Sequence, residues 1–381
     1  GYNVYQMPLA NKEALKLGKQ FVHNDICFPA QVNIGEALAT IKSGTFDPSN
    51  VAVGLAKNCE DCRAGHYVPL ARKALDEAGY PEVPIITTGD DVKNMHPGFK
   101  LGLGFQLRMV WGLLLVDGLE RMVRAIRPYE IHAGESNKVF EESLHRIDRA
   151  LADSGRKALG EFGKAVDRFN EIEYDRSVRK PRVGILGEVL MNFHPVANGN
   201  VEDYLERNGM EVVLASMSDF FRRVYMIDHD KAKRGLMPHP FMSGLINGLT
   251  EGVFRMTHKR VIKHYERFKL AEPHFDVHDL ARNVEGMMDK SYLAGEGWIM
   301  PGEIIELARE GVNSFVILNP FACIPNHITG RGMVKPLKKL FPHIQILSLD
   351  FDPDTSFANI ENRLQMLIIT ARELEKARRS A

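Results

Sequence analysis

The chain has 381 residues, and because a single hydrophobic core usually stops growing at about 250 to 300 residues, this length predicts two lobes. Its 49 basic and 49 acidic residues give a net charge of zero, which excludes a protein that binds nucleic acid through overall positive charge. A hydrophobic content of 44% excludes a disordered chain, and four cysteines are too few for a disulfide-rich secreted scaffold.

Strand-like and helix-like segments alternate in the first half of the chain, which is typical of an α/β fold. The apolar run at 51–56 predicts a buried strand. The pattern at 67–78 predicts a helix that ends at Gly79, and 83–87 predicts the next strand. Together these segments form one βαβ unit.

Two helical stretches and a domain boundary follow. Residues 105–126 are apolar on nearly all sides, which predicts a buried helix or helix pair, and the amphipathic segment 140–170 predicts a helical arm over the first lobe. Residues 176–181 are basic and end in proline, which is typical of a linker. We therefore expect a first α/β lobe at 1–178 and a second at 179–381.

The second half repeats the alternation and adds a helical insertion. We expect strands at 182–187, 210–215, 314–318 and 345–349, helices at 201–208, 302–310 and 360–379, and a long helical stretch at 220–268 broken near Gly235 and Pro238. The expected fold is thus α/β, with two Rossmann-like or flavodoxin-like lobes and helical excursions.

No segment predicts export or a membrane span. The N-terminus lacks the basic and apolar regions of a signal peptide. The most apolar run, 109–116, is far shorter than the ~20 residues that cross a bilayer. We therefore expect a cytoplasmic protein that contacts neither membrane nor nucleic acid. Because Gly1 stands in place of Met, the chain can also be part of a longer polypeptide.

All four cysteines fall in loops rich in proline, glycine or asparagine. Cys27 precedes a helix-like stretch, Cys59 and Cys62 lie between a predicted strand and a predicted helix, and Cys323 follows the strand at 314–318. Ligands of open α/β sheets bind beyond the carboxyl ends of strands. Free backbone N–H groups and the dipole at a helix start stabilise thiolate and sulfide charge.

Four interpretations of these cysteines remain open. They can be separate buried side chains, or Cys59 and Cys62 can form a dithiol redox motif. All four can hold a structural zinc ion, although such sites usually use two short Cys-x-x-Cys units. They can also bind an iron–sulfur cluster, for which four thiolates are the standard ligand set.

A family resemblance favours the cluster. Three cysteine segments resemble motifs of the 2-hydroxyacyl-CoA dehydratase-related iron–sulfur proteins: Asn-Asp-Ile-Cys-Phe-Pro-Ala (24–30), Cys-Arg-Ala-Gly-His-Tyr (62–67) and Asn-Pro-Phe-Ala-Cys-Ile-Pro-Asn-His-Ile-Thr-Gly-Arg-Gly (319–332). The chain most resembles the C-terminal module of acyl-CoA dehydratase activase-related proteins. Further similar segments lie at 127–130, 295–298, 350–354 and 362–367, so the resemblance extends from about residue 20 to about residue 370.

The resemblance implies a [4Fe-4S] cluster at the lobe interface, held by Cys27, Cys62 and Cys323. It also implies a separate ATP-dependent activase with an actin-like fold, which delivers low-potential electrons, and an acyl-CoA or other small-molecule substrate. Homo- or hetero-oligomers are compatible with it. Cys59 departs from the family pattern, and as a fourth ligand it would close the iron site that substrate-activating relatives leave open. The function is then either an ATP-driven iron–sulfur reductase or dehydratase component, or a pure electron carrier; a structural zinc or metal-free interaction protein is the third alternative.

Other motifs carry less weight. No Walker A string occurs, so we expect this chain not to bind ATP by itself. Glu188 and Glu296 are the candidates for positioning a substrate or moving protons. Arg63, Asn326 and His327 are candidate hydrogen-bond donors to cluster sulfurs. His274 and His278 are four residues apart, which suits a metal site on one face of a helix, but the histidines fit solvated or hydrogen-bonded side chains better.

Overall fold

The computed structural model describes residues 3–23, 25–55, 62–87, 99, 101–223, 231, 234–236, 241–273, 276–292 and 295–380. It is a mixed α/β structure with one four-stranded and one two-stranded sheet, both parallel. The α/β class that the alternating segments predict is therefore confirmed. None of the helices within these residues combines the length and the apolar character that crossing a membrane requires.

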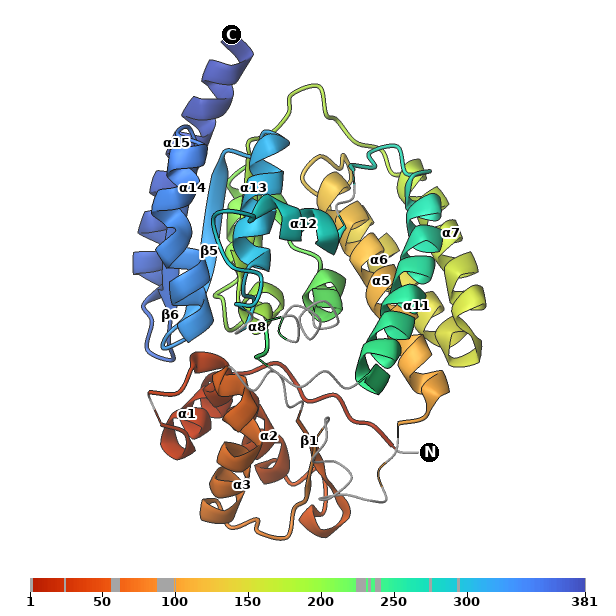
Figure 1. The fold of residues 1–381 in the computed structure, drawn as a ribbon, viewed down its shortest axis with the longest axis vertical. Coiled ribbons are helices and arrows are strands. Elements are labelled where there is room, and N and C mark those ends of the chain that lie inside the picture. The colour runs from red at the N-terminus through yellow and green to blue at the C-terminus, as the bar shows by residue number, and fades with distance from the viewer. Residues whose placement is uncertain are drawn as a thin grey trace.

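The larger sheet lies in the left part of the molecule in Figure 1, between the helices that cover its two faces. In spatial order, its strands are β4 (Glu211–Leu214), β3 (Arg182–Gly187), β5 (Ser314–Pro320) and β6 (Gln345–Phe351). Val183 of β3 pairs with Val212 of β4 on one side and with Ser314 of β5 on the other. All four strands lie within one or two residues of their predicted positions, because each is an apolar run bounded by turn residues.

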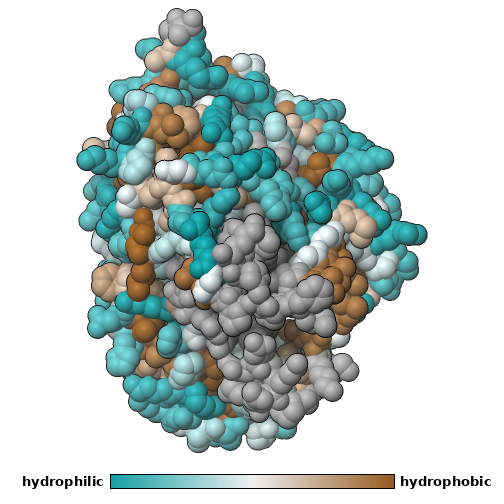
Figure 2. All heavy atoms as spheres, in the orientation of Figure 1, coloured by the Kyte–Doolittle hydropathy of each residue, from teal (hydrophilic) through white to brown (hydrophobic). Residues whose placement is uncertain are grey.

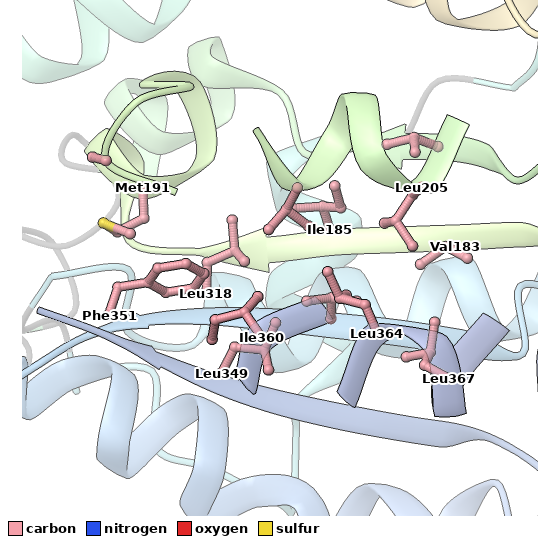
Figure 3. Packing of buried hydrophobic residues seen from close by; sticks show 14 of the residues in the cluster. Val183, Ile185, Met191, Leu205, Leu318, Leu349, Phe351, Ile360, Leu364 and Leu367 are labelled. Carbon is pink, nitrogen blue, oxygen red and sulfur yellow. The ribbon is translucent and has the colours of Figure 1, made fainter. Parts of the chain in front are cut away.

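Helices cover both faces of this sheet, as a parallel sheet requires. Alternate side chains of β5 point to opposite faces, so that Val316 and Leu318 enter one core while Phe315 and Ile317 enter the other. The first core packs against α8 (Val189–Phe193), α9 (Val201–Arg207) and α15 (Phe357–Ser380), and Figure 3 shows residues of α15 directed at the strands. The second core packs against α12 (Val277–Asn283), α13 (Ile299–Arg309) and α14 (Val334–Leu340).

A smaller α/β region lies beyond the carboxyl ends of the large sheet (Figure 1). It contains α1 (Lys12–Phe21), α2 (Phe28–Lys42), β1 (Val53–Gly54), α3 (Tyr67–Glu77) and β2 (Ile85–Ile86). The two predicted strands are thus confirmed in place but are only two residues long. The sequence did not predict helix α1. It packs so closely on α2 that a Cβ at Gly18 would lie 2.1 Å from the Gln31 carbonyl oxygen.

Four helices form a third packed region beside the large sheet. They are α5 (Leu103–Ile126), α6 (Glu135–Asp153), α7 (Gly155–Glu171) and α11 (Phe241–Tyr265), and their buried side chains make one core. The long helix predicted at 105–126 is confirmed, and the predicted arm at 140–170 is two helices that meet at Ser154. Figure 2 shows exposed apolar residues over the lower part of α11, which carries the exposed Leu245 and Leu249.

Candidate functional site

Each of the three described cysteines stands at the start of a helix or just beyond a strand. Cys27 immediately precedes α2, and Cys62 precedes a short 3-10 turn (Arg63–His66) that leads into α3. Cys323 lies in the turn after β5, where its backbone N–H donates to the Pro320 carbonyl oxygen. Pro29 lies in the first turn of α2, where its missing N–H costs no hydrogen bond, and Pro320 is the last residue of β5.

The structure brings these three loops together. The Phe28 backbone N–H donates to the Phe321 carbonyl oxygen at 3.3 Å, which joins the Cys27 loop to the Cys323 loop. The Arg63 guanidinium donates to the Asp25 carbonyl oxygen, which joins the Cys62 loop to the Cys27 loop. Cys27 and Cys323 are buried in the same apolar core, with exposed fractions of 3% and 4%, and Cys62 packs against it. Three segments that are far apart in sequence thus supply thiols to one core.

Burial dominates the electrostatics of these thiols. The helix start favours a thiolate at Cys27, yet desolvation raises the pKa of Cys27 to about 11. Desolvation also raises the pKa of Cys323 strongly, and the nearby carboxylates of Glu296 and Glu188 add to that effect. All three are free thiols. Cys27 and Cys323 therefore stay protonated at neutral pH unless a positively charged group replaces their protons.

Tyr67 is a site residue that sequence reasoning did not single out. Its hydroxyl lies 2.7 Å from the Cys27 sulfur, and the side chain is buried. Burial and then the proximity of Cys27 raise the pKa of Tyr67 well above its ordinary value, so the hydroxyl keeps its proton. A hydroxyl can donate a hydrogen bond to a sulfur and so tune a redox centre. The sequence feature that could have pointed to Tyr67 is its position at the end of the 62–67 motif.

The two candidate carboxylates, Glu188 and Glu296, lie side by side at the start of α8. Glu188 Oε2 accepts a hydrogen bond from the Met191 N–H at 3.1 Å, and Glu296 Oε1 accepts one from the Val189 N–H at 3.1 Å. Desolvation and then the neighbouring Glu296 charge raise the pKa of Glu188 to about 8. Because two close carboxylates resist ionising together, this pair holds a proton at neutral pH.

Backbone geometry fixes the Glu296 segment against the Cys323 loop. Gly295 has a φ of +56°, and a Cβ there would lie 2.6 Å from Pro325 Cγ. Ala322, next to Cys323, has a φ of +61°, a conformation that costs energy in residues other than glycine. The sharp turn after β5 and the close approach of Gly295 together bring Glu296 near Cys323.

The three side chains that we expect to donate hydrogen bonds to cluster sulfurs make other hydrogen bonds in this structure. Arg63 donates to the Asp25 carbonyl oxygen, Asn326 Nδ2 to the Leu318 carbonyl oxygen, and His327 Nδ1 lies 2.7 Å from the Cys323 carbonyl oxygen. These contacts brace the cysteine loops through their backbones. Their role as hydrogen-bond donors to cluster sulfurs stays a prediction.

The donor set fits an iron–sulfur cluster, because Cys27 and Cys323 lie in one apolar core, Cys62 packs against it, and thiolates are the ligands such clusters prefer. No three His, Cys, Asp or Glu side chains within the described residues are grouped to hold a single metal ion. A cluster of several irons spaces its ligands more widely than one ion does, so that result concerns only mononuclear sites. Cys59 and His274 lie outside the described residues.

No protein-family model matches this chain, and none of the curated proteins matches it either.

Proposed function

We propose that this chain is an iron–sulfur redox protein whose cluster is held by Cys27, Cys62 and Cys323. The observation that carries the proposal is the joining of three distant cysteine loops, through the Phe28–Phe321 and Arg63–Asp25 hydrogen bonds, around one apolar core. Separate structural cysteines need no such convergence. Bound there, the cluster would accept and donate one electron at a time.

The surrounding residues suit this chemistry. Burial of Cys27 and Cys323 excludes water from their sulfurs, which protects reduced sulfur and strengthens nearby electrostatic interactions. The Tyr67 hydroxyl, 2.7 Å from the Cys27 sulfur, would donate to it once the thiol proton is lost. Such a hydrogen bond stabilises added negative charge and therefore raises the reduction potential.

The Glu188–Glu296 pair would supply a proton to a substrate that takes an electron from the cluster. Desolvation and the neighbouring Glu296 charge raise the pKa of Glu188 to about 8, so Glu188 holds a proton at neutral pH, and both carboxylates lie close enough to raise the pKa of Cys323. A substrate that gains an electron becomes more basic and takes up a proton. We therefore propose Glu188 as the proton donor and Glu296 as the residue that raises its pKa.

The finer features follow the family resemblance and belong to the proposal. We place the cluster between a first lobe at 1–178 and a second at 179–381, with Cys59 as the candidate fourth ligand. Its electrons would come from an ATP-dependent activase with an actin-like fold, and an acyl-CoA thioester would be the substrate class. A pure electron carrier is the second candidate, because Cys59 as a fourth ligand would leave no open iron site for a substrate.

Metal analysis of anaerobically purified protein tests the proposal. We expect about four irons and four acid-labile sulfides per chain, and a Cys323→Ser variant should lose most of both, since a serine oxygen is a poor ligand for such iron. Ala71→Ser is the matched control, because it places a hydroxyl in the same core without removing a thiol. Zinc in place of iron, or full iron in Cys323→Ser, would contradict the proposal.

A further inference from the structure

Two features of the described residues lie apart from the cysteine region, and the proposed function does not involve them. One is the acidic cavity, a space of about 100 Å³ bounded by β4, α5 and α13. Its wall carries the carboxylates of Asp219, Glu303 and Glu310, and the Arg222 guanidinium lies 3.6 Å from Asp219. The other feature is the outward face of α11, which the described part of the chain leaves uncovered.

Helix α11 is apolar on two opposite faces. Its inner face carries Phe254, Val261 and Tyr265, which are buried in the four-helix core. With ~3.6 residues per turn, the opposite face presents four residues at spacings of four, three and four, which we call the outward seam: Leu245, Leu249, Gly252 and Met256. The three large side chains of this seam are exposed. Because a helix that is apolar on all sides is usually buried on all sides, the seam predicts a partner.

The chemistry of the seam favours another helix over a lipid surface. A Cβ at Gly248 or Gly252 would meet no atom within 4 Å, so a second backbone can approach closely there. The spacing of the seam is that of a coiled coil. Membrane-surface helices instead carry Lys and Arg on a polar face. Within 245–253 the one charged residue is Glu251, which pairs with the buried Arg222.

The seam is complementary to itself. When two copies of α11 run antiparallel about a two-fold axis between residues 250 and 251, Leu249 of each copy lies against Gly252 of the other. Leu245 of each copy then lies against Met256 of the other. Each Leu249 side chain thus fills the space that a glycine leaves open, which is how antiparallel helix pairs and isologous interfaces fit.

The first two turns of α5 extend this apolar surface. Helices α5 and α11 are in contact and begin at the same end of the bundle (Figure 1), and α5 exposes four large apolar side chains there: Leu103, Phe105, Leu107 and Met109. Together with the seam they expose on the order of 600 Å², which is at the upper end for a monomer and approaches the ~800 Å² that each partner buries in a stable interface.

We propose that this surface is the interface of a homodimer, in which the outward seams of two copies pack antiparallel about a two-fold axis. The occupant is a second copy of this chain, because the large and small residues of the seam match one another and the exposed area suits a dimer. The proposal does not depend on the iron–sulfur cluster.

Sedimentation velocity of the full chain at about 1 to 100 μM tests the proposal. We expect a reversible dimer, with twice the mass of one chain at the upper concentrations. Leu249→Asp places a carboxylate of each copy in the seam and should raise the dissociation constant at least about 100-fold. Met366→Asp adds the same charge on the exposed face of α15 and should leave the dimer unchanged.

Gly252→Leu separates a helix partner from a membrane. The new side chain has open space in the single chain, but it occupies the place of Leu249 of the second copy, so it should weaken the dimer at least about tenfold. Circular dichroism checks that each variant is folded.

The proposal is overturned if the wild type is monomeric throughout this range, or if Leu249→Asp remains dimeric. A monomeric wild type that pellets with vesicles of anionic phospholipid, with Gly252→Leu pelleting more strongly because it adds apolar surface, would assign the face to a membrane instead.

Discussion

The cysteine region and the acidic cavity differ in how they accommodate buried ionisable groups. Around Cys27 and Cys323 the chain is close-packed, and burial keeps each thiol neutral by retaining its proton. Along β4 the chain leaves a cavity, and carboxylates such as Asp219 face it with pKa values near neutrality. A thiol loses little when it is neutral and buried, whereas a carboxylate at pH 7 or above needs a cation or water.

This difference separates two kinds of site. The packed region can take a group that replaces thiol protons and bonds directly to sulfur, which suits a permanently held metal cluster. The hollow region leaves space beside its buried carboxylates, so a group there would enter and leave as a whole rather than bond to the protein. Helix α13 connects the two, because Glu296 precedes its first turn and Glu303 lies within it.

The largest effect should come from adding one methyl group to the packed region. Gly295→Ala would force a positive φ on alanine and place its Cβ 2.6 Å from Pro325. We expect a loss of about 3 to 5 kcal/mol in the free energy of unfolding, measured by urea denaturation. Gly79→Ala is the matched control, because Gly79 also has a positive φ, +90°, but has open space around it.

Gly79→Ala should cost only about 1 kcal/mol. Equal losses in the two variants would mean that the contact between Gly295 and the Cys323 loop does not constrain the packed region, and the comparison with the cavity would fail.

A smaller change in the free energy of unfolding, of opposite sign, is expected for Asp219→Asn in the cavity. Burial raises the pKa of Asp219 to about 7, so the folded state binds a proton more tightly than the unfolded state. Stability from this group therefore falls as pH rises from about 4 to about 7 and stays low above that. Asp219→Asn removes this penalty, which is at most about 4 kcal/mol, but leaves an amide in need of partners at a cost of about 1 to 3 kcal/mol.

We therefore expect Asp219→Asn to be about 1 to 3 kcal/mol more stable than the wild type at pH 8, and less stable or equal at pH 4. Urea denaturation across this pH range measures the difference between the two curves. Asp148→Asn, on the exposed face of α6, should show no such trend. A variant less stable than the wild type at pH 8 would show that the Asp219 charge is well compensated.

The smallest effect concerns the hydrogen bond inside the packed region. Tyr67→Phe removes the hydroxyl that lies 2.7 Å from the Cys27 sulfur, and should cost about 1 kcal/mol of unfolding free energy. Tyr80→Phe is the control, because Tyr80 packs partly buried against the same core and its hydroxyl has no hydrogen bond with described residues. In protein that carries iron, Tyr67→Phe should also lower the reduction potential, and an unchanged potential would place the hydroxyl outside the cluster's influence.

The sequence located the cysteine loops but not their surroundings. Turn residues beside Cys27, Cys62 and Cys323, each at a helix start or strand end, could be read directly, because such positions depend on local backbone preferences. Tyr67 could not be singled out as the neighbour of Cys27, since that contact joins the starts of two different helices. The acidic cavity was not predicted: Asp219, Glu303 and Glu310 look like ordinary surface acids until α5, β4 and α13 come together around one cavity.

By itself, the sequence determined the α/β class, the four strands of the large sheet and the long helix α5, because apolar periodicity and turn residues are local signals. It did not determine the length of β1 and β2, the presence of α1, or the division of 140–170 at Ser154. Those features depend on close contacts such as Gly18 against Gln31, which are made only when helices pack. The same reason separates the two regions. Cysteine chemistry is visible in a single residue type, whereas the pKa of a buried carboxylate depends on which groups the tertiary structure places around it.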